Sequence, residues 1–254
     1  MEPIVNRFKQ RLAAPGVRYG LFVSMGDQVA AEIAAASDFD WLIVDTEHAP
    51  NDIRTTLTQL QAMQAYDTDL VVRPTEGNRA QIKRLLDIGA QTLLIPMVDT
   101  AEEATAMVAC TRYPPNGLRG VASARAARWS RVDGYFASAD DQVCVIAQIE
   151  SREGMTNLDA ICAVPGVDAL FVGPSDLAAD LGHLGDPGHP EVQDAVLTTL
   201  HRIRANGKPA GVYAATPDAA DRYAEAGATL VIVGVDTAVL TNAFAALAAR
   251  FQDD

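Results

Sequence analysis

Short apolar runs alternate with longer amphipathic stretches along most of the chain. The apolar runs have the length of buried strands, and they lie at residues 18–23, 41–45, 69–73, 92–96, 143–149, 168–172, 208–212 and 229–233. Each amphipathic stretch is long enough for a helix of about ten residues or more. These stretches lie at residues 27–36, 51–65, 77–88, 100–112, 152–163, 189–206, 217–226 and 237–251. Eight strands alternating with eight helices predict an α/β fold, the (β/α)8 TIM barrel.

Two further features refine this prediction. Residues 4–13 alternate apolar and basic side chains at helical spacing, and Pro15-Gly16 follows, which predicts a short N-terminal helix. A doubly wound open sheet would show the same alternation, but no glycine-rich phosphate turn follows the first apolar run at residues 23–27. We therefore expect one barrel domain that spans residues 1–254.

Composition limits the partners that this chain can have. The formal charge of -13 argues against nucleic acid or an anionic membrane, because both need a basic surface. The cysteines at positions 110, 144 and 162 lack metal or redox spacing, so we expect reduced, buried thiols. No apolar leader segment and no apolar run of about 18 residues is present, which predicts a soluble, cytoplasmic protein.

The connection at about 113–142 interrupts the alternation and is longer than most loops in compact domains. It carries Arg119, Arg125, Arg128 and Arg131, a basic run in an acidic protein. Loops of this length are usually functional or disordered. Two interpretations stay open: a lid that helps to hold an anionic substrate, or a segment in contact with solvent or with another subunit.

Barrel enzymes place their active sites at the carboxyl ends of the strands, so the residues after each apolar run are the candidates for chemistry. They are Asp45 and His48 after the second run, Arg73 after the third, Gln148 and Glu150 after the fifth, and Gly173, Pro174, Ser175 and Asp176 after the sixth. Alternate strand residues share a face, so Gln148 and Glu150 point the same way. The fourth, seventh and eighth runs end without obvious chemistry.

Glu150 and Asp176 are the candidate metal ligands. Mg²⁺ and similar ions prefer a few carboxylates together with waters and substrate oxygens. Helix capping is the alternative, because acidic residues favour the first turn of a helix. The paired position at one edge of the barrel, with Gln148 on the same face, favours the metal.

His48 and Arg73 are candidates for proton transfer and charge stabilisation. An imidazole with an unperturbed pKa of about 6.5 suits a general base, and a turn histidine bonded to the backbone is the alternative. Arg73 can stabilise an oxyanion or a carboxylate, or form an ion pair with a neighbouring acid. We expect the other histidines, His183, His189 and His201, to lie in solvent. No lysine ends a predicted strand, so a Schiff-base mechanism is not supported.

Four segments together resemble one enzyme family. They are Phe39 to Asp52 (FDWLIVDTEHAPND), Val72 to Pro74 (VRP), Ala147 to Glu150 (AQIE) and Phe171 to Asp176 (FVGPSD). The family is the metal-dependent 2-keto acid aldolases. More narrowly, the chain resembles the 4-hydroxy-2-oxoheptanedioate and 2-keto-3-deoxy-rhamnonate aldolases of the phosphoenolpyruvate/pyruvate barrel superfamily.

The resemblance implies an aldehyde-lyase that reversibly cleaves 4-hydroxy-2-keto acids to pyruvate and an aldehyde, through a pyruvate enolate held by Mg²⁺, Mn²⁺ or Co²⁺. The implied metal ligands are Glu150 and Asp176. The implied substrate-binding residues are Gln148, Gly173, Pro174, Ser175 and Asp176. The implied catalytic residues are His48, Arg73 and Asp87, and Asp45 is a further candidate because it lies close to His48 in the sequence.

Asp87 ends the predicted helix before the fourth strand, so within its own barrel it should lie opposite the active site. We hypothesise that it reaches the partner subunit's His48. The resemblance also implies a homohexamer, a dimer of trimers with an exchanged C-terminal helix. The alanine-rich stretch at residues 237–251 fits that role, and an ordinary last barrel helix is the alternative.

Two other functions stay open from the sequence. A malyl- or citramalyl-coenzyme A lyase would keep the barrel and the metal, but no coenzyme A site is recognisable here. A non-catalytic barrel would use the carboxylates at the strand ends as helix caps. The sequence does not determine the aldehyde partner or the preferred metal, since two carboxylates suit Mg²⁺, Mn²⁺ and Co²⁺ alike.

Overall fold

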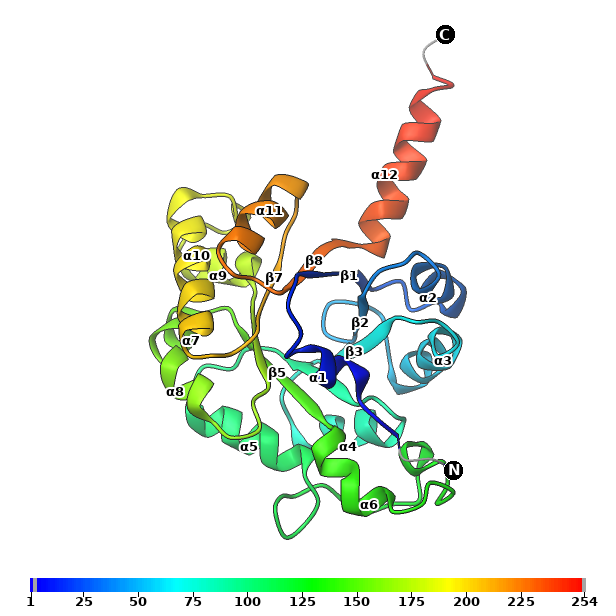
Figure 1. Ribbon diagram of the computed structural model, residues 1–254. Helices are drawn as coiled ribbons and strands as arrows, with labels where there is room; N and C mark the ends of the chain where they lie inside the picture. The colour runs from blue at the N-terminus through cyan, green and yellow to red at the C-terminus, as the bar shows by residue number, and fades with distance from the viewer. Residues whose placement is uncertain (2–3, 253–254) are drawn as a thin grey trace.

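A closed ring of eight parallel strands forms the centre of the computed structural model, which describes residue 1 and residues 4–252 (Figure 1). The strands are β1 (Arg18–Val23), β2 (Trp41–Asp45), β3 (Asp69–Arg73), β4 (Thr92–Ile95), β5 (Cys144–Ile149), β6 (Ala169–Val172), β7 (Ala210–Tyr213) and β8 (Leu230–Val235). Each strand pairs with the next along the chain, and β8 pairs with β1 to close the ring. The predicted TIM barrel is confirmed.

Helices surround this ring, and α12 alone points away from it in Figure 1. The helices are α1 (Arg7–Arg11), α2 (Gln28–Ala35), α3 (Ile53–Met63), α4 (Arg79–Asp87), α5 (Ala101–Thr111), α7 (Arg152–Thr156), α8 (Leu158–Ala163), α9 (Pro174–Asp180), α10 (Pro190–Ala205), α11 (Pro217–Glu225) and α12 (Asp236–Ala249). Within the described part of the chain, no helix has both the length and the apolar character needed to cross a membrane.

Two predicted segments have more internal structure than the sequence pattern suggested. The single helix predicted at 152–163 is two helices, α7 and α8, because the chain leaves helical geometry at Asn157. The side-chain amide of Asn157 donates to the carbonyl of Asp99 at 2.8 Å, which ties this break to the connection between β4 and α5. The connection at 113–142 contains the short helix α6 (Tyr135–Ser138) and two 3-10 turns, η1 (Arg125–Ala127) and η2 (Ala139–Gln142).

The core has two layers, because successive strand residues point to opposite sides of the barrel wall. On β2, Trp41 and Ile43 face the barrel interior, whereas Leu42 and Val44 pack against the helices. Trp41 meets Phe171 across the interior, with ring centroids 6.4 Å apart. All three cysteines are buried and free, as predicted.

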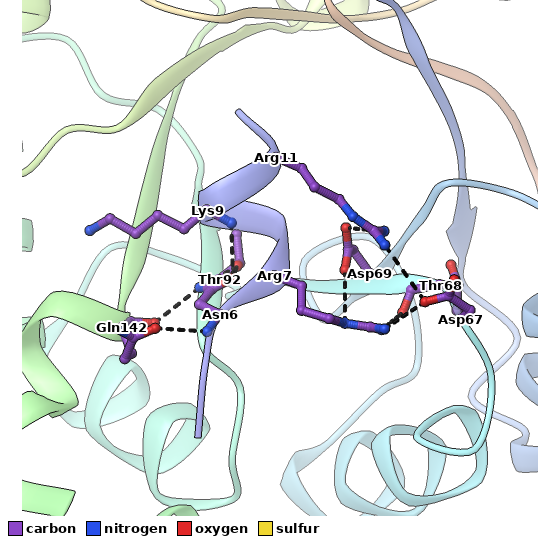
Figure 2. Close-up of polar contacts among 9 residues, drawn as sticks. All are labelled: Asn6, Arg7, Lys9, Arg11, Asp67, Thr68, Asp69, Thr92 and Gln142. Atoms are coloured by element: carbon purple, nitrogen blue, oxygen red, sulfur yellow. Dashed lines mark hydrogen bonds and ion pairs between the residues drawn. The ribbon is translucent and has the colours of Figure 1, made fainter. Parts of the chain in front are cut away.

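The predicted N-terminal helix is confirmed as α1, which is held at the amino ends of the strands by polar contacts (Figure 2). The side-chain amide of Asn6 donates to Oγ1 of Thr92 and to the carbonyl of Gln142, both at 3.0 Å. Arg11 donates to the buried carboxylate of Asp69 at 3.0 Å. These contacts join α1 to β3, to β4 and to the end of the 113–142 connection.

Phe8 of α1 enters the barrel from this end and should be a main source of its stability. Its ring is 2% exposed and lies 5.6 Å from the ring of Trp41, centroid to centroid. Phe8→Ala would leave a cavity at the base of the interior core, and we expect it to lower the free energy of unfolding by about 3–5 kcal/mol. Urea denaturation measures this change.

The matched control is Gln10→Ala on the exposed face of the same helix. That substitution should change the free energy of unfolding by no more than about 0.5 kcal/mol. Equal effects of the two substitutions would mean that α1 contributes through its helical structure and not through the Phe8 contact.

Candidate active site

The carboxyl ends of the strands surround a cavity of about 250 Å³. Most of its polar lining comes from residues that the sequence singled out: Asp45, His48, Arg73, Gln148, Glu150, Ser175 and Asp176. Ser24 and Thr237 complete that polar lining. Gly173 and Pro174 also line it, and Phe22, Phe171 and Tyr213 supply aromatic walls. The structure thus brings together every predicted site residue except Asp87.

Arg73 and Asp45 form a fixed ion pair at the base of this cavity. β2 and β3 are in register so that the two residues lie side by side. Nε and Nη2 of Arg73 each donate to one oxygen of Asp45, at 2.8 Å. Burial alone would lower the pKa of Arg73, but the hydrogen bonds and charge of Asp45 outweigh it and raise that pKa. Arg73 therefore stays charged while its side chain is held in one orientation.

Glu47 also belongs to the site, although the sequence analysis did not assign it. Its Oε2 lies 3.1 Å from Nη1 of Arg73 and 3.7 Å from Nε2 of His48. Burial raises the pKa of Glu47, against the opposing charges of Arg73 and His48. The position of Glu47 directly before His48 was the signal that could have identified it.

His48 lies at the mouth of the cavity, where its side chain is 63% exposed. Within the described residues, the imidazole of His48 forms no hydrogen bond with the backbone. The interpretation as a turn histidine bonded to the backbone is therefore wrong. An exposed imidazole beside a carboxylate can exchange protons with a substrate in the cavity and with solvent.

Glu150 is a buried carboxylate at the end of β5. It is 2% exposed, and its Oε1 accepts the backbone N–H of Met97 at 2.9 Å. Its Oε2 accepts the side-chain amide of Gln148, which confirms that the two side chains share a face. Burial raises the pKa of Glu150 to about 7, and the negative charges of Asp176 and Glu47 act in the same direction. No basic side chain of the described residues forms an ion pair with Glu150.

The donor atoms in this cavity fit a hard divalent cation. Glu150 and Asp176 offer carboxylate oxygens, and the side-chain oxygen of Gln148 is buried without a hydrogen-bond partner among the described residues. Among the described residues, the carboxylates that line the cavity are those of Asp45, Glu150 and Asp176, and Arg73 is the one guanidinium in the lining. The cavity therefore carries excess negative charge that a cation would balance.

Two backbone features hold Glu150 in place. Met97 adopts a φ of 50°, which is uncommon for a residue other than glycine, and this conformation directs its N–H toward Glu150. Gly173 has no room for a side chain, because a Cβ there would lie 2.9 Å from Cβ of Glu150 and 3.2 Å from Nε2 of Gln148. The end of β4, which the sequence analysis left without chemistry, therefore positions the candidate metal ligand.

Asp87 and the 113–142 connection lie at the opposite end of the barrel. Asp87 ends α4, and its carboxylate is 3.6 Å from the guanidinium of Arg119. Arg125 donates to the carbonyl of Ile88 at 2.6 Å. None of residues 113–142 lines the strand-end cavity. This connection is therefore not a lid over the active site of its own chain, which corrects one of the two interpretations.

A larger cavity, of about 510 Å³, lies at this opposite end between α1 and the 113–142 connection. Its carboxylates, Asp67 and Asp69, are already paired with Arg7 and Arg11. The strand-end cavity instead holds the carboxylate of Glu150 and the side-chain oxygen of Gln148. Among the described residues, the first has no ion-pair partner and the second has no hydrogen-bond partner. The chemistry of the lining, and not the volume, identifies the candidate active site.

Comparisons with known proteins match nearly the whole chain. A family model described as HpcH/HpaI aldolase/citrate lyase matches residues 18–243. A hydroxypyruvate/pyruvate aldolase of Pseudomonas aeruginosa is 53% identical over 99% of this chain and 95% of its own length. A 4-hydroxy-2-oxo-heptane-1,7-dioate aldolase of Salmonella dublin is 52% identical over 97% of this chain and 94% of its own length.

Solved structures give the same result. An HpcH/HpaI aldolase/citrate lyase family protein from Burkholderia cenocepacia superposes with a TM-score of 0.94 at 42% identity, and covers 98% of this chain and 100% of that one. An HpcH/HpaI aldolase from Desulfitobacterium hafniense superposes with a TM-score of 0.89 at 30% identity, over 97% of this chain and 96% of that one.

The contact at Gly173 can be tested by adding one methyl group. Gly173→Ala should push Glu150 and Gln148 away from their present positions and weaken Mn²⁺ binding by about 10- to 100-fold. Titration calorimetry of the chelator-treated protein measures this affinity. Gly120→Ala is the control, because a Cβ at Gly120 meets only the flexible side chain of Lys83, at 3.2 Å, in the connection at the opposite end of the barrel. Unchanged affinity in Gly173→Ala would show that Glu150 does not need this close packing.

Proposed function

The chain belongs to the HpcH/HpaI aldolase/citrate lyase family, and on that basis we propose that it is a metal-dependent class II aldolase that cleaves 4-hydroxy-2-keto acids reversibly to pyruvate and an aldehyde. The observation that carries this proposal is the identity of more than half of all positions, over nearly the full length, to two enzymes named as aldolases. A coenzyme A thioester lyase and a non-catalytic barrel are not favoured by these relatives.

The proposed metal ligands are Glu150 and Asp176, and the proposed ions are Mg²⁺, Mn²⁺ and Co²⁺. When bound there, a divalent ion supplies Lewis-acid stabilisation of the negative charge that develops on pyruvate. Gln148 offers its unpartnered side-chain oxygen at the same place. Gly173 and Pro174 stand at the start of α9, and the N–H groups of Ser175 and Asp176 in its first turn can donate to a substrate carboxylate.

Arg73 is proposed to stabilise the oxyanion of the enolate. Breaking the bond between C3 and C4 releases the aldehyde and leaves the electron pair on the pyruvate half, so negative charge on its oxygen is the main barrier. Asp45 holds the guanidinium before the reaction begins, and a preorganised charge needs no reorientation as the enolate forms.

His48 is the proposed general base. In cleavage it takes the proton of the C4 hydroxyl, and in synthesis it returns that proton to the aldehyde oxygen. The carboxylate of Glu47 lies between His48 and Arg73, and its negative charge attracts both side chains. We assign Glu47 a positioning role, because its carboxylate contacts His48 and Arg73.

We further propose that the active enzyme is a homohexamer, a dimer of trimers. Helix α12 supports this, because only Asp236 at its start is buried in the single chain. The large apolar side chains exposed along this C-terminal segment are Val239, Leu240, Phe244, Leu247 and Phe251. Exchange of α12 between subunits would cover them. Asp87 would then act from one subunit on the partner subunit's His48.

Exchange of the pyruvate methyl protons for deuterium in D₂O tests enolate formation without any choice of aldehyde. NMR should show exchange with Mg²⁺ or Mn²⁺ and none after chelation. Arg73→Ala should slow the exchange by about 10²–10³-fold, because the enolate loses a fixed positive charge. Glu150→Gln should slow it through loss of a metal ligand.

Arg54→Ala is the matched control, since Arg54 is an exposed arginine in the first turn of α3. It should exchange protons at the wild-type rate. Absence of exchange with every metal tested would contradict pyruvate enolate chemistry at this site.

The proposed role of Asp87 has its own test. A carboxylate beside the partner subunit's His48 would stabilise the positive charge that this imidazole gains when it accepts a proton. Asp87→Asn should therefore slow aldol cleavage by at least about tenfold and move the acidic limb of the pH profile to lower pH. Asp141→Asn, at an exposed position of the same end, should change neither. An unshifted profile at full rate in Asp87→Asn would exclude this role.

A further inference from the structure

Three side chains outside the active-site cavity converge in the connection between α9 and α10. His183 lies in this connection, His189 caps α10, and Glu191 lies in the first turn of α10. One ligand atom from each residue lies within 4.8 Å of the other two. Both histidines are partly exposed to solvent, as expected, but their rings also stack, with centroids 3.5 Å apart and 15° between the planes. Nε2 of His183 lies 2.9 Å from Oε2 of Glu191.

The backbone holds the connection in shape without help from these side chains. The N–H of His183 donates to the carbonyl of Ala178 at 2.7 Å. The N–H of Asp186 donates to the carbonyl of His183 at 2.9 Å, and the N–H of His189 donates to the carbonyl of Asp186 at 3.1 Å. Gly182 supplies a left-handed turn with a φ of 90°. The donor groups therefore start from fixed positions, and a ligand would not have to order the loop.

The cluster offers one carboxylate and two imidazole rings as donor groups. The hydrogen bond from His183 lowers the pKa of Glu191, which favours the carboxylate form that binds cations. The ring nitrogens of His183 and His189 are the other two candidate donor atoms.

We propose that His183, His189 and Glu191 form a second divalent-metal site, one that takes Zn²⁺ and similar borderline ions in preference to Mg²⁺. Two imidazole nitrogens and one carboxylate oxygen are a typical Zn²⁺ donor set, with water in the fourth position. Mg²⁺ prefers oxygen ligands and retains several waters, so it should not bind here.

The distances fit this ion. With metal–ligand bonds of about 2.0–2.2 Å, a tetrahedral ion holds its donor atoms about 3.4 Å apart. The separation of 2.9 Å between His183 and Glu191 needs to widen only slightly for a metal to replace the shared proton. Nδ1 of His189 accepts only a long hydrogen bond, 3.3 Å from the N–H of Glu191, which costs little to give up.

Charges of both signs surround the cluster. The N-terminus of α10 carries a partial positive charge, and the charge of Arg152 acts on Glu191, so both oppose metal binding. Glu191 in its first turn and Asp186 in the preceding connection offset that charge. An ion bound here would tie the connection to α10 and stabilise the folded state.

This site is separate from the active site. Asp176 lies in the first turn of α9, and His183 follows the end of that helix. The seven residues of α9 span about 10 Å. The two sites share no residue, and their donors differ, with oxygen atoms in one and mainly nitrogen atoms in the other. Binding at the second site can therefore be measured in a protein whose active-site ligands have been removed.

The experiment uses the full chain with Glu150→Gln and Asp176→Asn, which removes the proposed active-site ligands. After chelation and equilibrium dialysis, this double variant should bind one Zn²⁺ per chain and no Mg²⁺. Zn²⁺ should also raise its Tm by a few degrees. Addition of His183→Gln and His189→Gln should abolish both the bound Zn²⁺ and the rise in Tm.

His201→Gln is the matched control, because His201 is an exposed histidine on α10 outside the cluster. It should leave the bound Zn²⁺ unchanged. The Tm of the metal-free variants, compared with the parent, reports whether the fold is kept. Absence of bound Zn²⁺ in the parent double variant, or binding that survives loss of both histidines, would overturn the proposal. Neither result depends on whether the chain cleaves keto acids.

Discussion

The burial of Glu150 is the constraint from which the arrangement at the strand ends follows. A carboxylate removed from water costs several kcal/mol unless other groups replace its solvation. Here the N–H of Met97 and the amide of Gln148 replace part of it, and the rest appears as a pKa raised to about 7. The arginine of the site does not help, because Asp45 already holds it. Glu150 therefore has no ion-pair partner in the described part of the chain and stays available to bind a cation, whereas the guanidinium of Arg73 pairs with Asp45 and Glu47.

Most of the fold could be predicted because it depends on local patterns. The β3 run at 69–73 has the same bounds in the sequence pattern and in the structure, and the capping pair Thr100 and Glu103 opens α5 where a helix was expected. The barrel rule then placed Asp45, Arg73 and Glu150 in one cavity, since parallel strands end on the same side. These three residues could be placed because each one ends, or directly follows, an apolar run in the sequence.

The features that the sequence did not reveal depend on contacts between distant segments. Met97 looked unremarkable because its contribution comes from a backbone N–H and a left-handed φ, which leave no mark in the residue type. The break at Asn157 coincides with a hydrogen bond to Asp99 in the connection between β4 and α5. The stacking of His183 on His189 requires a specific loop shape, which no periodicity encodes. None of these three contacts can be inferred from residue types or from periodicity alone.

The position of α1 has a consequence for how the protein forms during synthesis on the ribosome. Some partners of this segment, Thr92 and Gln142, follow Asn6 by 86 and 136 residues and are made later. β1 can pair with β2 as soon as β2 is made, but its other partner, β8, is the last strand of the ring to be made. The ring can therefore close, and shield its interior from water, only after most of the chain has been made. Until then, nascent chains should expose apolar strand faces and should need protection by chaperones.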